Sequence, residues 1–205
     1  MMRAALLRRG LLAALPLLLA ACAATPPPPP AIIPVAAWGG EPGPASGARQ
    51  TISRITLHHQ GETWVVGHDP AAYLRRLQQW SRLSKRWADI PYHYVIAPDG
   101  RIYAARPPEQ AGDTNTEYDP RGHALVMLLG NFEEVEPSRE QLLATAELMA
   151  WLARAHRLSP ELIASHKDYS AQTVCPGRNL YAYLENGWLR RAVAARMAGQ
   201  PAPPL

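Results

Sequence analysis

The stretch from Tyr92 to Ala104, YHYVIAPDGRIYA, predicts a β-hairpin. Its two halves, residues 92–96 and 101–104, are rich in aromatic and β-branched side chains, which favour extended strands. Residues 97–100 between them end in Asp-Gly, a dipeptide that strongly indicates a tight turn between antiparallel strands. The hairpin therefore supplies two adjacent antiparallel strands of a predicted sheet.

Three segments outside the hairpin are also predicted strands. Residues 52–57 alternate apolar and polar side chains, which is the period of a strand with one buried face. Residues 124–129 form an unbroken apolar run, as expected of a central strand that is buried on both faces. Residues 162–165 form a shorter strand that leads into His166.

Helices are predicted between and after these strands, each from a local start signal. They run from Pro70, capped by Asp69, to about Arg86; from a capping box at Ser138 and Gln141; and from Pro176, with Gly187 as a possible break. Interleaved strands and helices predict an α/β fold with a mixed central β-sheet and helices packed on its faces. We expect one domain, residues 38–198, because this length suits a single core.

Two histidines and one cysteine lie at the ends of these predicted elements. His58 follows the strand 52–57, His166 follows the strand 162–165, and Cys175 immediately precedes the last helix. Strand ends and helix starts of an α/β sheet meet at one rim, so these side chains are expected to converge. Three such donors can hold Zn²⁺ and leave a fourth position for water. A helix start would also stabilise the Cys175 thiolate.

Four ordered segments of the chain resemble the amidase-2 family, which includes peptidoglycan recognition proteins and phage-type N-acetylmuramoyl-L-alanine amidases. The segments are ITLHH at 55–59, PYHYVIAPDGRIY at 91–103, LGNF at 129–132 and HKDYSAQTVCPG at 166–177. With Trp38-Gly39 as a weaker match, they span nearly the whole predicted domain. Chance is a poor explanation for four matching segments in the same order as in the family.

The resemblance implies a role for five residues. His58, His166 and Cys175 would be the zinc ligands, Tyr92 would hold the attacking water or the oxyanion, and Thr173 would face the scissile carbonyl. The loop from His166 to Cys175 is one residue longer than is usual in the family, so a local bulge is expected near Thr173. The implied reaction is zinc-dependent hydrolysis of the amide bond between N-acetylmuramic acid and L-alanine, in peptidoglycan or muropeptides. Zinc would act by polarising the carbonyl and by lowering the pKa of water toward ~7.

Other polar and aromatic residues are assigned to the core or to support. His59 and His93 alternate with His58 and Tyr92, so they are expected to point to the opposite face. His123 ranks below His58 as a ligand, and Asp168 is a candidate for orienting a ligand imidazole. Trp80 lies at helical spacing and is interpreted as core. The proton donor to the leaving amine stays open.

Two other functions compete with an amidase. Some recognition proteins bind muropeptides without cutting them, and such members typically lack the cysteine ligand, so Cys175 favours an enzyme. A thiol hydrolase would instead use Cys175 as nucleophile and His166 as base.

The chain begins with a predicted signal peptide, residues 1–21. The first nine residues carry three arginines and no acid, and the apolar run that follows is shorter than the ~20 residues of a transmembrane helix. Residues 19–22, Leu-Ala-Ala-Cys, resemble the bacterial lipobox, so Cys22 is the predicted lipidation site. The alternative is an ordinary signal cleaved at an A-x-A site, with Cys22 there by chance.

A lipidated cysteine and a proline-rich tether are predicted for residues 22–37, since the run Pro26–Pro30 is extended and semi-rigid. Residues 199–205 are expected to be a disordered tail. Lipidation implies an exported protein. Ala23 resembles the residue found in lipoproteins of the outer membrane, so we expect the domain to face the periplasm from that membrane.

The charge of the chain limits its partners. The formal net charge of +4 falls to +1 when the signal peptide and its arginines are removed, and no basic stripe follows residue 37. This balance argues against nucleic-acid binding. The expected partners are peptidoglycan or a muropeptide as substrate and a membrane through the lipid anchor, and we expect a monomer.

Overall fold

The computed structural model describes residues 27–43 and 49–205. The predicted signal peptide and Cys22 lie outside these ranges. Within these ranges, six strands form one sheet in the order β1-β4-β3-β5-β2-β6. The strands are β1 (Ile32–Ile33), β2 (Arg54–His59), β3 (Tyr94–Ile96), β4 (Ile102–Ala104), β5 (His123–Leu128) and β6 (Ile163–Ser165).

The sheet is mixed, as predicted. Neighbours β3, β5, β2 and β6 are parallel to one another, whereas β4 is antiparallel to β3 and β1 is parallel to β4. The predicted hairpin is confirmed as β3 and β4. Because β2, β5 and β6 are parallel neighbours, their carboxyl ends lie at the same edge of the sheet, and this edge carries the candidate site.

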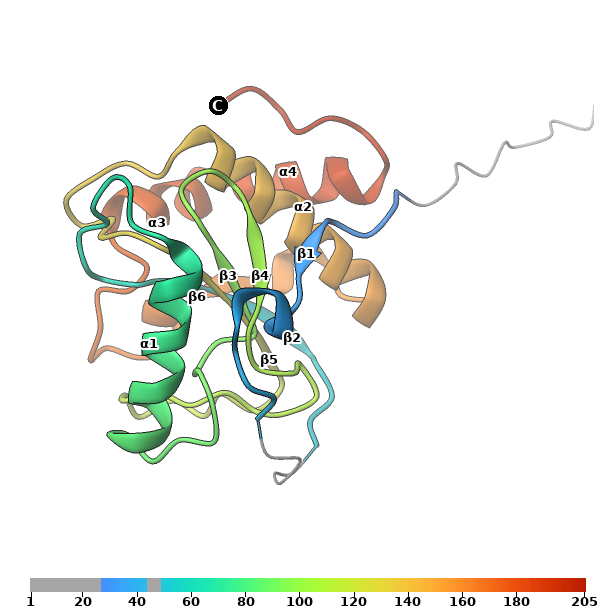
Figure 1. Ribbon diagram of the computed structural model, residues 1–205. Coiled ribbons are helices and arrows are strands. Elements are labelled where there is room, and N and C mark those ends of the chain that lie inside the picture. Colours follow the sequence, from blue (N-terminus) through green and yellow to red (C-terminus); the bar gives the residue numbers. More distant parts are fainter. Residues whose placement is uncertain (1–26, 44–48) are drawn as a thin grey trace, which may run out of the picture.

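In the part of the chain that the structure describes, four α-helices cover the two faces of the sheet (Figure 1). They are α1 (Pro70–Leu83), α2 (Arg139–His156), α3 (Arg178–Glu185) and α4 (Trp188–Met197), with short 3-10 turns at Val35–Trp38, Pro160–Leu162 and His166–Asp168. Residues of α1 pack in one buried cluster, and residues of α2, α3 and α4 pack in another. This confirms the α/β, single-domain prediction. Within the described ranges, no helix is both long and apolar enough to cross a membrane.

The helix starts follow the predicted local signals. The Asp69 carboxylate accepts the backbone N–H groups of Ala71 and Ala72, and Pro70 takes the first position of α1. Ser138 and Gln141 exchange both hydrogen bonds of a capping box at α2. These bonds satisfy N–H groups that a helix start leaves unpaired.

One helix end differs from the predictions. Helix α1 stops at Leu83 rather than near Arg86, and Arg86 itself has a φ of 58° that no helix continues through. The possible break at Gly187 is confirmed, because α3 and α4 are separate helices on either side of Gly187, which has a φ of 72°. A glycine adopts this left-handed conformation without the steric cost that other residues meet.

The core lies on both sides of β5. All six residues of β5 are buried, which confirms the prediction of a central strand. On the side of α2, Val126 and Leu128 pack with side chains of that helix, whereas Met127 packs on the α1 side with Leu74 and Trp38. Close packing on both faces of β5 restricts movement of the sheet edge that carries the candidate site.

The N-terminal boundary of the domain differs from the prediction. Residues 22–37 were expected to be tether, but Ile32–Ile33 forms β1 and pairs with β4, and the Trp38 indole donates to Ala104 O at 2.7 Å. An uncovered edge strand leaves a row of unpaired backbone groups. Strand β1 covers that edge, so the folded domain begins at about Ile32.

The C-terminal tail also differs from the prediction. Residues 199–205 form no helix or strand, but Ala202 packs against the core cluster. The Trp188 indole N–H donates to Pro203 O at 3.2 Å and to Pro204 O at 2.9 Å. A buried indole needs an acceptor, and the tail supplies it instead of being disordered.

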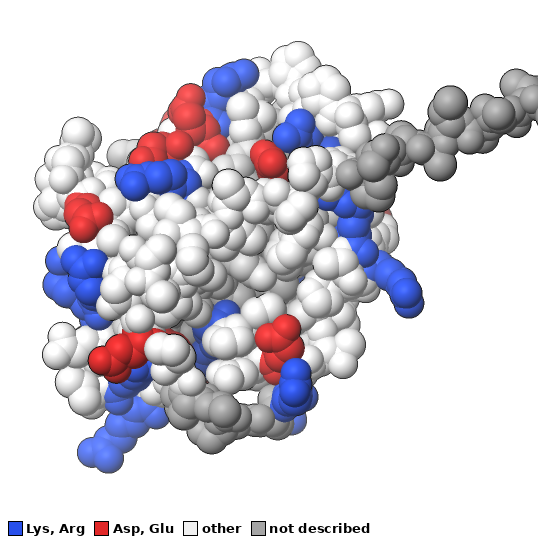
Figure 2. All heavy atoms as spheres, turned by 45° about the vertical axis from the view of Figure 1, so that its right-hand side comes forward, with Lys and Arg blue, Asp and Glu red and all other residues white. Residues whose placement is uncertain are grey.

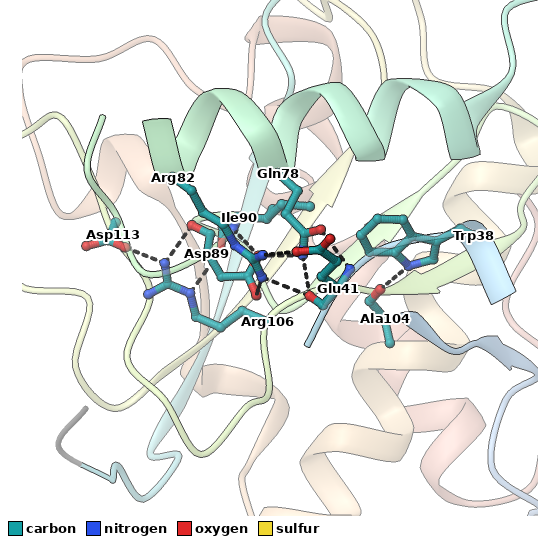
Figure 3. Close-up of polar contacts among 9 residues, drawn as sticks. All are labelled: Trp38, Glu41, Gln78, Arg82, Asp89, Ile90, Ala104, Arg106 and Asp113. Atoms are coloured by element: carbon teal, nitrogen blue, oxygen red, sulfur yellow. Dashed lines mark hydrogen bonds and ion pairs between the residues drawn. The ribbon is translucent and has the colours of Figure 1, made fainter. Parts of the chain in front are cut away.

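A buried polar network joins α1 to the loops beside the site (Figure 3). Asp89, 1% exposed, accepts from Gln78 Nε2 at 2.9 Å and from Arg82 Nη2 at 3.1 Å. Arg106 donates to Asp89 O at 2.8 Å and contacts the carboxylate of Asp113. Because buried charges persist only when paired, this network fixes residues 84–91 and 106–113 relative to α1.

Charged side chains of both signs share the face seen in Figure 2. Lys and Arg side chains lie among Asp and Glu side chains around a broad uncharged centre (Figure 2). Mixed charges of this kind give no extended field of one sign over that face.

Candidate metal centre

Two predicted ligands lie side by side at the carboxyl edge of the sheet. Leu57 of β2 pairs with Ser165 of β6, so the residues that follow, His58 and His166, are neighbours across parallel strands. Their ring centroids are 4.8 Å apart, which is close to the spacing of adjacent strands. The predicted convergence of these two histidines at one rim is confirmed.

Cys175 reaches the same point from the loop after β6. Its Sγ lies 3.6 Å from His58 Nδ1, and one ligand atom each from His58, His166 and Cys175 all lie within 4.8 Å of one another. Tetrahedral zinc with bonds of ~2.0 Å to nitrogen and ~2.3 Å to sulfur would place these two atom types roughly 3.5 Å apart. The donor set and its spacing therefore fit zinc.

The surroundings of Cys175 differ from the prediction. Helix α3 begins at Arg178, not at Pro176, so the sulfur does not cap a helix start. Gly177, the residue before α3, has a φ of 86°, and a Cβ there would lie 2.5 Å from the carbonyl carbon of Phe132, so this position requires glycine. In place of the helix, the backbone N–H of His59 donates to Sγ at 3.3 Å.

Burial controls the ionisation of the three donors. It raises the pKa of the Cys175 thiol to about 12, although the His59 N–H favours the thiolate. It lowers the pKa of His166 to about 4 and that of His58 well below 6.5, the latter also because His166 lies beside it. Neutral imidazoles keep a lone pair for a metal, and a bound cation would deprotonate the thiol.

Tyr92 lies beside this group but not on a strand. Its ring centroid is 5.1 Å from that of His58, and burial raises its pKa well above 10, so the hydroxyl remains a donor at neutral pH. Strand β3 begins only at Tyr94, and at His93 the ring Nδ1 accepts the N–H of Leu125. Tyr92 packs on the α1 side, whereas Tyr94 packs on the α2 side.

The three donors and Tyr92 open into one cavity of about 240 Å³. Thr173 also lines it, and its Oγ1 accepts the backbone N–H of Cys175 at 3.1 Å. The loop segment 113–116 forms the opposite wall. All five predicted site residues in the described ranges therefore meet in one place.

A second groove, of about 370 Å³, adjoins this cavity. It is lined by Arg76 and Trp80 of α1 and shares Trp87, Tyr92 and Asn115 with the cavity. Trp80 was interpreted as core, but it is 44% exposed, because it lies on the solvent side of α1 at the edge of this groove. The site thus continues as an open channel along α1.

Residues 48–178 match the family described as N-acetylmuramoyl-L-alanine amidase, Amidase_2. The chain belongs to this family. It is 28% identical over 162 residues to peptidoglycan-recognition protein SD of Drosophila simulans, covering 75% of this chain and 84% of that protein. It is 29% identical over 169 residues to N-acetylmuramoyl-L-alanine amidase of Sus scrofa, covering 78% of this chain and 27% of that protein.

Solved structures of Amidase_2 relatives share the fold. The crystal structure of Drosophila peptidoglycan recognition protein SD superimposes with a TM-score of 0.65 at 28% identity, covering 76% of this chain and 93% of that chain. The mixed sheet and single domain are therefore those of the family.

Three further histidines of this Amidase_2 domain, His59, His93 and His123, have other partners. His59 Nδ1 accepts the N–H of Phe132 at 3.3 Å, His93 bonds the backbone on both ring nitrogens, and His123 Nδ1 lies 2.7 Å from Thr56 Oγ1. As expected, none of the three belongs to the group of metal donors found among the described residues.

Asp168 does not orient an imidazole, which corrects the expectation. Its Oδ2 accepts the backbone N–H and the hydroxyl of Ser165, and its Oδ1 accepts the Tyr181 hydroxyl at 2.8 Å. The residue within hydrogen-bond distance of the His166 imidazole is Thr116, whose Oγ1 lies 2.7 Å from His166 Nε2. Sequence reasoning missed Thr116 because its loop carries no helical or strand period.

Proposed function

We propose that this protein hydrolyses the amide bond between N-acetylmuramic acid and L-alanine in peptidoglycan or muropeptides, with zinc held by His58, His166 and Cys175. One observation carries the proposal: three donor atoms within 4.8 Å of one another share an open cavity with the Tyr92 side chain. Membership of the Amidase_2 family and relatives named as amidases support the same reaction.

Zinc, when bound, supplies a Lewis acid that polarises the amide carbonyl and makes water a nucleophile at neutral pH. The Tyr92 hydroxyl, kept protonated by burial, donates to the charge that develops on the carbonyl oxygen. Thr173 Oγ1 already accepts from Cys175 N, so its own proton is available to a substrate acceptor in the cavity.

The groove along α1 suits the rest of the substrate. Trp80 and Trp87 offer aromatic faces for sugar or peptide, and Arg76 offers a cation for the carboxylates of a stem peptide. Specific sites of this kind combine apolar walls with a few polar anchors.

A peptidoglycan-binding module without activity is the second candidate, because several relatives are named as recognition proteins. The complete donor set favours an enzyme over it. A thiol hydrolase is the third. Cys175 is only 7% exposed and its sulfur lies beside His58 Nδ1, an arrangement that suits a shared metal better than a free nucleophile.

The test is to incubate the purified protein with sacculi and with muropeptides, with and without chelator, and to identify the products by mass spectrometry. We expect free stem peptides with L-alanine at the amino end, loss of the reaction in chelator and its return with added zinc. Binding without products would favour the recognition module. Activity that resists chelator but is abolished by mild alkylation would favour the thiol hydrolase.

We also propose that the mature protein starts at Cys22 and is held by acyl chains on the outer membrane, facing the periplasm. Leu-Ala-Ala-Cys at residues 19–22 motivates this proposal, and it lies outside the described residues. We expect Cys22→Ser to abolish labelling by a fatty acid and to remove the protein from the membrane fraction. Cys175→Ser is the matched control and should keep both. Unchanged labelling of Cys22→Ser would refute the anchor.

A further inference from the structure

The contact between Thr116 and His166 has no role in the chemistry above. Thr116 Oγ1 lies 2.7 Å from His166 Nε2, and both side chains line the cavity. An imidazole that binds a metal through one nitrogen carries a proton on the other. The partner of that second nitrogen sets the tautomer and the ring orientation.

The contacts indicate which nitrogen of each histidine faces the metal. Nε2 of His166 is occupied by Thr116, which leaves Nδ1 for the donor group. His58 has the same orientation, with Nδ1 3.6 Å from Cys175 Sγ, and its Nε2 has no hydrogen-bond partner among the described residues. Both imidazoles therefore present Nδ1 to the group.

The neighbouring hydroxyl fixes the direction of the hydrogen bonds. If Nδ1 of His166 binds zinc, Nε2 carries the proton and donates to Thr116 Oγ1. The Thr116 hydroxyl then donates to Thr114 Oγ1, 2.8 Å away, which also accepts the Thr116 backbone N–H at 3.1 Å. In this direction the proton on His166 Nε2 and the proton of the Thr116 hydroxyl each have an acceptor.

The loop that carries Thr116 is held from both ends. A Cβ on Gly112 would lie 2.2 Å from Leu125 Cδ1 and 2.4 Å from Pro91 O, so only glycine allows the loop to pass there. Arg106 contacts Ala111 O and Asp113, as Figure 3 shows for Asp113. At the other end, the Ser170 hydroxyl donates to Glu117 Oε2 at 2.7 Å.

We propose that Thr116 is a positioning residue for the metal centre: it accepts Nε2–H of His166 and so fixes the tautomer and ring orientation that present Nδ1 to zinc. The inference rests on the proposed function, because it takes His166 as a zinc ligand. Its acceptor is held by contacts of residues 106–117 that need no metal.

The test measures zinc affinity by competition with a chelator for the parent, Thr116→Val and Thr116→Ser. Valine keeps the shape and removes the hydroxyl, so we expect zinc affinity to fall about 10- to 100-fold, as when a partner of a metal-bound histidine is lost. Serine keeps the hydroxyl and should restore affinity to near the parental value. Thermal unfolding of the metal-free proteins checks that all three fold.

A matched control and a spectroscopic measurement separate this role from a structural one. Thr63→Val is the control, because it removes the hydroxyl of another threonine. That hydroxyl donates to Glu134 Oε2 at 3.1 Å and has no contact with the three metal donors, so zinc affinity should stay unchanged. Nitrogen-15 NMR of the zinc-loaded parent should show the His166 proton on Nε2, protected from exchange. That protection should be lost in Thr116→Val.

Parental zinc affinity in Thr116→Val, or ligation through Nε2 of His166, would overturn the inference. If His166→Ala still loses zinc in that case, the proposed function survives. A parent protein that binds no zinc would overturn both.

Discussion

Cys175→Ala, His58→Ala and His166→Ala are each expected to lose zinc and, with it, amide hydrolysis. The three donor atoms lie within 4.8 Å of one another, so each would bind directly to one zinc ion. Structural zinc in zinc-finger peptides is bound with about 10–16 kcal/mol. If each of three protein donors carries roughly a third of such a value, removing one costs about 3–5 kcal/mol, which is about 10²–10⁴ in affinity. Metal analysis of the purified variants measures it.

His123→Gln is the matched control for these substitutions. His123 is buried near the site, but its ring bonds Thr56 and is not one of the metal donors. We expect this variant to keep one zinc per chain and most of its activity. Full zinc occupancy in Cys175→Ala would contradict the ligand assignment, whatever its activity.

The parts of the fold that local physics decides were predictable from sequence. The Asp-Gly turn predicted the hairpin of β3 and β4, and the capping residues Asp69 and Ser138 predicted the starts of α1 and α2. The structure confirms all three. The convergence of His58 and His166 followed from strand ends alone, because parallel neighbours end at one edge.

The parts that long-range contacts decide were not predictable. The period-2 pattern extends a strand through Tyr92, but the strand begins only at Tyr94, and the His93 ring, not a backbone carbonyl, accepts the N–H of Leu125. Residues 32–33 follow a proline run and were predicted to be part of a tether, yet they pair with the edge strand β4 and form a strand. Thr116 and His166 are far apart in sequence, and only the fold brings them to 2.7 Å.

Tyr92→Phe is expected to lower kcat by about 10²–10³ with little change in KM. The hydroxyl would donate to charge that appears only in the transition state, and one such donor is typically worth about 2.7–4 kcal/mol. The structure indicates that this substitution removes the hydroxyl without disturbing the packing of the ring. The Tyr92 ring packs on the α1 side beside the His58 ring, at 5.1 Å between centroids, and phenylalanine keeps that ring. Zinc content should therefore stay parental.

Tyr94→Phe is the matched control for Tyr92→Phe, because it removes a tyrosine hydroxyl two residues away on the opposite face. Tyr94 is 5% exposed and packs edge-on against Trp151, at 6.2 Å between ring centroids, in the core cluster on the α2 side. We expect parental kcat, KM and zinc content for it. A kcat within a few-fold of the parent in Tyr92→Phe would assign Tyr92 to packing alone. Loss of zinc in that variant would instead make Tyr92 a support for the metal donors, because a hydroxyl that acts only on the transition state leaves metal binding unchanged.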